Sequence, residues 1–428
     1  MIPVTDATPG LAESRNAGCR CVTLEATLLR EQLERDSDLT GLSSELQRTH
    51  PHLFSSTAVF VPHSVAEAIQ AAISAIERVV ALPQYQTQVL SVAPDVARKD
   101  FGPRGVFTSY DFHLGASGPR LIEINTNAGG ALLNAALSRA QRSCCHATDE
   151  SWSGLPGYGL PDTDIVAMFH DEWRLQRGST PLARLLIVDH EPATQHLAPE
   201  FELFVRLFRR YGIDAAIADP QELRCRDAQL EHRGTRIDLI YNRLTDFYLA
   251  DTGHEMLKAT YQDGAVVLTP HPRAHALYAA KTNLALLSDV SRLRAWGVPA
   301  ADQALLASAV PATRLVTREN ADQLWAERRR LFFKPFAGFG ARAAYRGDKV
   351  TRRVWDEIRA GGFVAQELVP PTERLVDVDG TAVRLKFDLR AYTYAGRIQL
   401  LAARLYRGQT TNMRTAGGGF APVLLTPN

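Results

Sequence analysis

The stretch that most constrains the fold is residues 104–132, RGVFTSYDFHLGASGPRLIEINTNAGGAL, which predicts a β-hairpin followed by a glycine turn. One strand is expected near 106–114 and a second near 120–125. The residues between them, 115–119, are glycine, alanine, serine and proline, which supply the turn that a hairpin loop needs. The Gly129-Gly130 pair then predicts a turn into a helix.

The register of this hairpin decides which side chains share a face. If the chain folds about Ser117, Asp111 lies opposite Glu123, because side chains alternate between the two faces of a strand. The predicted apolar face holds Tyr110, Phe112, Leu114, Ile122 and Ile124. The predicted polar face holds Ser109, Asp111, His113, Glu123 and Asn125.

Two carboxylates and an amide oxygen lie on this polar face, at Asp111, Glu123 and Asn125. Hard oxygen ligands of this kind suit Mg²⁺, with substrate phosphates filling its remaining positions. An ordinary amphipathic hairpin with a solvated polar face explains the same stretch equally well when it is taken alone.

Composition excludes several classes of protein. The chain has 428 residues, 45% of them hydrophobic and 22% charged, which indicates a globular protein of two or three domains. A net charge of +1 gives no reason to expect a nucleic-acid or membrane partner. The start of the chain lacks a signal-peptide pattern, and five cysteines without zinc-knuckle spacing indicate reduced thiols and a cytoplasmic location.

The order of patterns predicts three regions in an α/β (α+β) chain. Residues 1–160 should form N-terminal helices and the hairpin, and 143–164, rich in Gly, Pro and Ser, looks like a linker. Residues 161–267 alternate strand and helix, which indicates a small parallel α/β domain. Residues 268–428 should form a third, nucleotide-binding region.

The third region holds two candidate nucleotide motifs. In FFKPFAGFG, Lys334 ends a strand and is followed by a loop with Gly338 and Gly340, so backbone N–H groups and a lysine could meet phosphates. The strand FVAQELV, with Gln366 and Glu367, could offer backbone groups to an adenine edge. A simple glycine hairpin and a core strand remain open as alternatives.

Together these pieces resemble the ATP-grasp superfamily, in the permuted arrangement of the glutathionylspermidine synthetase-like and related carboxylate–amine ligases. The resemblance covers residues ~100–135 and ~268–428, and its motifs occur in the order that the permuted family uses. It implies an ATP-grasp fold preceded by a small parallel α/β domain.

The resemblance assigns roles to residues that match the family's motifs. The metal ligands for Mg²⁺ would be Asp111, Glu123 and Asn125. The ATP-binding residues would be Lys281 in KTNL, Lys334 with Gly338 and Gly340 in KPFAGFG, and Gln366, Glu367 and Leu368 in the adenine strand. Asn412 is a secondary candidate for the nucleotide site.

One departure concerns the charge that steadies the transferred phosphoryl group. The family often has an arginine two residues before the metal-binding aspartate, and here that position is Ser109. Arg390 or Arg404, on a late hairpin predicted at 385–394 and 399–406, is expected to supply the charge instead.

The implied function is an ATP- and Mg²⁺-dependent ligase that joins a carboxylate to an amine through an acyl phosphate. Its partners would be a small-molecule or peptide carboxylate and an amine, whose identities stay open, as does the oligomeric state. A phosphotransferase on the same scaffold is one alternative. A catalytically lapsed nucleotide-binding protein, suggested by Ser109, is another. A zinc site at His271 and His275 is disfavoured, because Pro272 intervenes and no third ligand follows.

Overall fold

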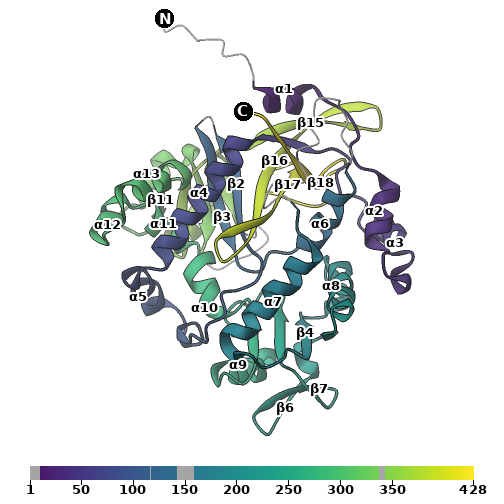
Figure 1. The fold of residues 1–428 in the computed structure, drawn as a ribbon. Helices are drawn as coiled ribbons and strands as arrows, with labels where there is room; N and C mark the ends of the chain where they lie inside the picture. The colour runs from purple at the N-terminus through teal and green to yellow at the C-terminus, as the bar shows by residue number, and fades with distance from the viewer. Residues whose placement is uncertain (1–9, 116, 142–158, 337–342) are drawn as a thin grey trace, which may run out of the picture.

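A computed structural model describes residues 10–115, 117–141, 159–336 and 343–428 (Figure 1). Its largest element is a seven-stranded sheet with the order β1-β18-β17-β16-β2-β3, with β15 paired to β16. Both ends of the chain contribute to this sheet. Its strands are β1 Val59–Pro62, β2 Thr108–Gly115, β3 Gly118–Asn125, β15 Thr372–Val378, β16 Thr381–Tyr394, β17 Arg397–Tyr406 and β18 Gly419–Thr426.

The predicted hairpin is confirmed as β2 and β3. Asp111 pairs with Glu123 and Ser109 with Asn125, as the turn chemistry predicted. An irregularity follows Asp111, so that Phe112 pairs with Leu121. The prediction that Ile122 lies on the apolar face is therefore wrong: Leu121 is buried in the core, and Ile122 lines a cavity on the other side.

Helices cover the two faces of this sheet. The amphipathic helix α4, His63–Val80, packs its buried residues, such as Ile69 and Ile76, against the apolar side of β2 and β3. On the other face, α6, Ala131–Arg139, packs against β17 and β18. The helix α6 starts at Gly130, whose φ of +90° suits glycine, and a Cβ there would collide with the Phe420 ring.

The remaining N-terminal helices differ in part from expectation. The helical spacing predicted over 21–49 corresponds to two helices, separated by a short turn at Ser37–Leu39. The two helices are α2 Ala26–Leu33 and α3 Leu42–Thr49. The other N-terminal helices are α1 Leu11–Gly18 and α5 Pro83–Val92.

The predicted small α/β domain is present as a four-stranded parallel sheet with the order β10-β9-β4-β5. It occupies the lower part of Figure 1. A three-stranded sheet, β6-β7-β8, extends from it and was not predicted. The elements of this region, with both sheets and their helices, are α7 Asp162–Arg177, β4 Arg184–Val188, α8 Ala198–Arg210, β5 Asp214–Ala218, β6 Leu223–Arg226, β7 Gln229–His232, β8 Thr235–Arg236, β9 Leu239–Asn242, α9 Glu255–Gln262 and β10 Val267–Thr269.

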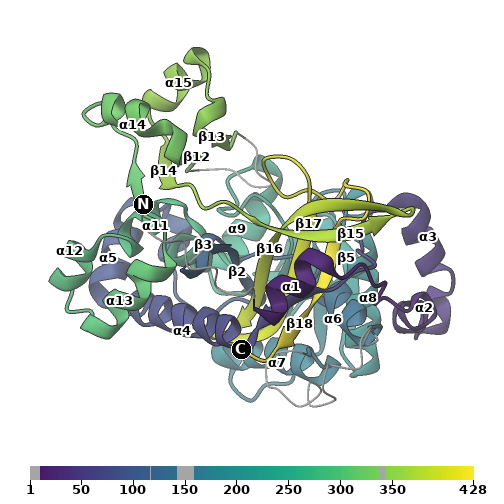
Figure 2. The same ribbon diagram turned by 90° about the horizontal axis from the view of Figure 1, so that it is seen from above.

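A fourth sheet, with the order β11-β14-β12-β13, forms a separate lobe, which stands out from the body of the molecule together with α14 and α15 (Figure 2). Its core is a small cluster around Phe333 and Trp355. The elements of the lobe are β11 Thr313–Leu315, α14 Ala321–Glu327, β12 Leu331–Pro335, β13 Tyr345–Arg346, α15 Arg352–Arg359 and β14 Phe363–Glu367. Before the lobe the chain forms helices whose buried residues, such as Leu284 and Leu306, pack on the core beneath α4. These are α10 Pro272–Ala274, the π-helical η7 His275–Ala279, α11 Thr282–Leu287, α12 Val290–Ala295 and α13 Ala300–Ala309.

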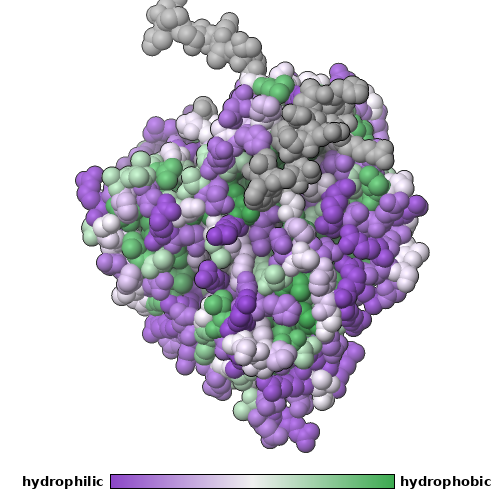
Figure 3. Space-filling view, in the orientation of Figure 1, coloured by the Kyte–Doolittle hydropathy of each residue, from purple (hydrophilic) through white to green (hydrophobic). Residues whose placement is uncertain are grey.

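The face of the molecule drawn in Figure 3 is mostly polar. On the face drawn in Figure 3, hydrophobic residues form small patches scattered among hydrophilic ones. Within the described ranges, no helix combines the length and the apolar character that a bilayer crossing requires.

Candidate nucleotide and metal site

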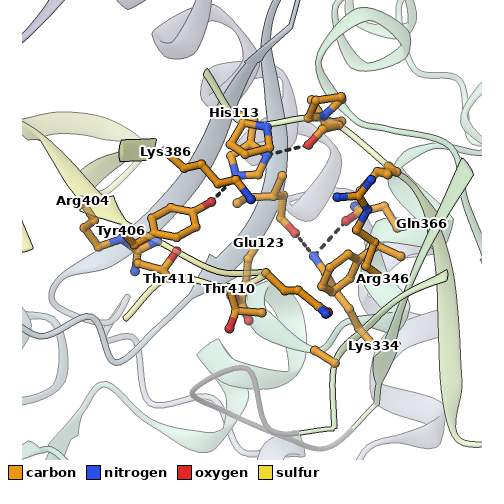
Figure 4. Close-up of a pocket in the computed structure, with 18 of the residues that line it drawn as sticks. His113, Glu123, Lys334, Arg346, Gln366, Lys386, Arg404, Tyr406, Thr410 and Thr411 are labelled. Carbon is orange, nitrogen blue, oxygen red and sulfur yellow. Dashed lines mark hydrogen bonds between the residues drawn. The ribbon is translucent and has the colours of Figure 1, made fainter. Parts of the chain in front are cut away.

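The central cavity, of about 440 Å³, lies between the polar side of the hairpin and the lobe formed by β11–β14. Figure 4 shows side chains from both sheets pointing into it. The predicted site residues that line it are Glu123, Asn125, Lys281, Lys334, Gln366, Glu367, Leu368, Arg390 and Arg404. These residues come from strands that are distant in the sequence, so the fold brings most of the predicted set to one place.

Lys281 and Lys334 approach the cavity from different elements. Lys281 precedes α11, and its Nζ lies 3.5 Å from Glu123 Oε1. Lys334 is on β12, and its Nζ donates hydrogen bonds to Ile122 O and, at 2.8 Å, to Gln366 Oε1. Two ammonium groups beside one carboxylate leave an excess of positive charge, which suits a polyanion.

The surroundings of Lys334 change its pKa. Burial, the largest effect, and the neighbouring charge of Lys281 together lower the pKa of the ammonium group to about 8, although Glu123 and Asp111 act in the opposite direction. A partly desolvated lysine of this kind gains most from an anionic ligand, which would restore its full charge.

Asp111 lies beneath the cavity and not in its lining. It is 1% exposed, and its carboxylate accepts hydrogen bonds from Arg390 at 2.8 and 2.7 Å and from Arg404 at 2.8 Å. Burial raises the pKa of Asp111, but the two guanidinium groups outweigh burial and hold that pKa at about 2. In this arrangement Asp111 anchors arginines, which differs from the metal-ligand role that the resemblance implied.

Asn125 connects Asp111 to the cavity. Its Nδ2 donates to Asp111 Oδ2 at 3.2 Å, which leaves Oδ1 as the oxygen available to a cation. Glu123 lies two residues earlier on β3 and also lines the cavity. An anionic and a neutral oxygen on one strand face match the chemistry of a Mg²⁺ site that shares its cation with phosphates.

Arg404 is fixed by a second buried carboxylate. Its Nε donates to Asp388 Oδ1 at 2.7 Å, and Thr411 donates its hydroxyl to Asp388 Oδ2. Asp388 is fully buried. Asp388 was not among the predicted site residues, and its place opposite Arg404 on the predicted late hairpin is the signal that could have identified it.

The strand that the resemblance assigned to adenine runs along the cavity, but its N–H groups are already used. Glu367 N donates to Ala312 O and Leu368 N to Arg330 O, each at 2.8 Å. Gln366 is 2% exposed, and its Nε2 has no hydrogen-bond partner among the described residues. The side chain of Gln366 is therefore the better-placed donor for a ligand.

Other predicted residues lie outside the lining. Asn412 holds its own loop, because its Oδ1 accepts hydrogen bonds from Arg414 N and the Thr415 hydroxyl, whereas Thr410 and Thr411 line the cavity. Gly338 and Gly340 lie outside the described residues.

His113 lines the central cavity, and the sequence analysis gave it no role. Its Nδ1 lies 2.7 Å from Val369 O, and burial lowers its pKa. Its place on the polar face of β2 was the available signal.

Both ring nitrogens of His271 have hydrogen-bond partners, and one of them caps a helix. Nδ1 accepts a hydrogen bond from Ala274 N, and Nε2 lies 2.9 Å from Pro103 O. His275 instead stacks on Phe247 at 4.0 Å between ring centroids. His271 therefore caps a helix, whereas His275 packs against an aromatic ring.

Comparisons with known proteins place the fold. No protein-family model and no curated protein sequence matches the chain. Among solved structures, a glutathione synthetase-like effector from Globodera pallida aligns with a TM-score of 0.56 and 10% identity, over 95% of this chain and 99% of that one. A putative gamma-glutamylcysteine synthetase from Methylobacillus flagellatus aligns with a TM-score of 0.44 and 12% identity, over 85% and 87%. The ATP-grasp ligase PsnB, complexed with Mg and ADP, aligns with a TM-score of 0.27 and 16% identity, over 52% and 89%.

The first of these alignments extends over nearly the whole of both chains, and at its level of identity it establishes the fold alone. The chain has an α/β ATP-grasp fold, which confirms the fold that the sequence motifs predicted.

Proposed function

Starting from a chain with the ATP-grasp fold, we propose that the protein is an ATP- and Mg²⁺-dependent ligase that joins a carboxylate to an amine. One observation carries this proposal. Lys281, Lys334, Glu123 and Asn125 converge from separate elements on a single cavity of about 440 Å³, between two sheets. A volume of this size fits a nucleotide-sized ligand.

Glu123 and Asn125 would hold the cation. Their oxygens share one face of β3, and the hydrogen bond from Asn125 Nδ2 to Asp111 orients the amide so that its oxygen is free for this role. When bound, Mg²⁺ neutralises phosphate charge and aligns the reacting groups. This proposal keeps two of the three predicted ligands and gives Asp111 the separate task of positioning arginines.

The cationic side chains would hold the triphosphate. Lys281 and Lys334 bind its oxygens, and Arg390 and Arg404 stabilise the phosphoryl group in transfer, which compensates for Ser109. Both guanidinium groups line the cavity, and buried carboxylates fix their positions. Preorganised charges of this kind lower the barrier without further reorganisation during the reaction.

The proposed reaction has two displacements. A substrate carboxylate oxygen attacks the γ-phosphorus of ATP, and ADP leaves. The nitrogen of an amine then attacks the acyl carbon of the resulting acyl phosphate, inorganic phosphate leaves and the amine loses a proton. The residues position substrates and balance charge, so this chemistry needs no nucleophilic serine or cysteine. A small-molecule or peptide carboxylate and an amine are the proposed partners.

A screen of ADP release tests this function against its alternatives. Amino acids, short peptides and polyamines are added to protein, ATP and Mg²⁺, with and without hydroxylamine. A ligase forms an acyl hydroxamate when its carboxylate is present. A phosphotransferase releases ADP and forms no hydroxamate. A lapsed site, the alternative suggested by Ser109 in place of the family's arginine, releases no ADP.

A further inference from the structure

A second cavity, of about 290 Å³, lies on the opposite side of β2 from the central cavity. This rear cavity is enclosed by the end of α4, by α5, by the loop that precedes β2 and by α10 with η7. Figure 1 shows these helices gathered at one side of the sheet. Neighbouring residues mark the two sides of the strand, because Tyr110 packs toward α4 whereas Asp111 contacts Arg390 on the other face.

The anionic wall of the rear cavity is Glu77. One oxygen accepts a hydrogen bond from the Tyr110 hydroxyl at 2.9 Å, and the other accepts one from Tyr278 at 2.7 Å. Each carboxylate oxygen has a further lone pair, so the group can still accept from a ligand. These two tyrosines, of which Tyr110 is buried and Tyr278 partly buried, hold the carboxylate in a fixed orientation toward the cavity.

The cationic wall is Arg104. Its side chain makes no hydrogen bond or ion pair with the residues that the structure describes, although it lines the cavity and its charge acts on Glu77 and Tyr278. Burial, the largest effect, raises the pKa of Glu77, and Arg104 lowers it. The guanidinium group therefore lies near Glu77 and has no ion-pair partner of its own among the described residues.

The backbone of Arg104 is rigidly held. Glu172 on α7 is fully buried, and its two oxygens accept hydrogen bonds from Arg104 N and Gly105 N, each at 2.8 Å. The same carboxylate also accepts from the hydroxyls of Thr269 and Tyr394. Because the backbone of this loop is already fixed, a ligand would have to order only the arginine side chain.

The other charged groups of the cavity already have partners. Arg273 pairs with Asp100 at 3.3 Å and donates to Gln86 Oε1 at 3.0 Å. His271 uses both ring nitrogens, as described above. Glu77 and Arg104 are thus left as one negative and one positive group that face a small polar cavity.

We propose that the rear cavity binds a small zwitterion of the α-amino acid class, with its ammonium group on Glu77 and its carboxylate on Arg104. The pairing follows from charge, because carboxylates bind guanidinium groups in a forked geometry and a carboxylate accepts the hydrogen bonds of an ammonium group. The cavity lies at the small end of the range for ligand sites, which suits a single amino acid. The site is separate from the central cavity and does not depend on the proposed ligase reaction.

Isothermal titration calorimetry with a panel of α-amino acids, from glycine to L-lysine, tests this site in the full chain without nucleotide. The best binder is compared with its α-amide, which lacks the carboxylate, and with its N-acetyl form, which lacks the ammonium group. Both analogues should bind roughly tenfold or more weakly than the amino acid, which corresponds to about 1.4 kcal/mol.

Arg104→Gln and Glu77→Gln locate the binding. Arg104→Gln should lower the affinity for the best amino acid to that of its α-amide in the wild-type protein, and Glu77→Gln should lower it to that of the N-acetyl form. Arg104→Lys should restore part of the affinity. Arg104 is exposed, so its variants are expected to fold, and thermal melting checks this. The proposal is overturned if no amino acid binds at millimolar concentration, or if folded Arg104→Gln binds the panel as wild type does.

Discussion

Arg390 and Asp111 face each other across the adjacent strands β16 and β2 and are joined by two hydrogen bonds, of 2.8 and 2.7 Å. The carboxylate is almost completely buried, so each charged group compensates the other for the water contacts that burial removes. Because Arg404 adds a third bond to the same carboxylate, one buried aspartate fixes two guanidinium groups at the edge of the central cavity.

Removing this carboxylate should destabilise the fold. Asp111→Asn leaves two buried guanidinium groups with less compensation, and the loss of one partner from such a pair costs about 3–5 kcal/mol. Urea unfolding measures the change. Asp356→Asn is the control, because it removes an exposed ion pair with Arg359 on α15 and should cost about 1 kcal/mol or less. Equal effects of the two substitutions would show that Asp111 does not anchor the arginines.

Glu123→Gln should abolish Mg²⁺-dependent ATP turnover and leave the fold intact. The substitution removes the anionic oxygen at the proposed cation site but keeps the volume of a side chain that lines a cavity. Turnover is measured across a Mg²⁺ titration, with the exposed Glu202→Gln on α8 as the control. Wild-type activity of Glu123→Gln at limiting Mg²⁺ refutes the metal assignment.

Lys334 predicts a pH dependence of nucleotide binding. Its ammonium group is charged below its pKa of about 8 and neutral above it, so the affinity for a triphosphate should fall as pH rises through this value. Lys334→Arg keeps its charge at these pH values and should flatten this part of the profile. The test measures the affinity of both proteins for a non-hydrolysable ATP analogue from about pH 7 to 9 and compares the two profiles. A profile that falls equally in both proteins excludes Lys334 as the titrating group.

Lys281→Ala should weaken ATP binding and lower turnover. A charge-assisted contact to phosphate contributes roughly 1.5–3 kcal/mol, which corresponds to an increase in Kd of about ten- to a hundredfold. Lys349→Ala removes an exposed lysine that does not line the central cavity and serves as the control. If Lys281→Ala binds a fluorescent ATP analogue as tightly as this control does, Lys281 has a structural role.

Local chemistry made much of the fold predictable. The turn residues around Ser117 set the register in which Asp111 meets Glu123, and the alternation over 184–218 identified the parallel sheet. The irregularity after Asp111 was not predictable, because it depends on how Leu121 fits beneath α4. Strand β18 was missed for a similar reason, since one of its two partners, β1, lies far away in the sequence.

The gathering of most candidate residues around one cavity was predictable from their positions on the expected strands, and their roles stay predictions. Lys281 and Lys334 do line one cavity with Glu123. The pairing of Asp111 with Arg390 and Arg404 required the strand order β17-β16-β2, which no local pattern reveals. The domain boundaries at 160 and 267, the roles of Gly338 and Gly340 and the cytoplasmic location stay predictions.

The most direct test of the central claim is a crystal structure of the protein with a non-hydrolysable ATP analogue and Mg²⁺. The account predicts the triphosphate between Lys281 and Lys334, with the cation on Glu123 and Asn125 and the base beside Gln366. Nucleotide bound away from the two lysines, or a cation that leaves Glu123 untouched, would contradict it.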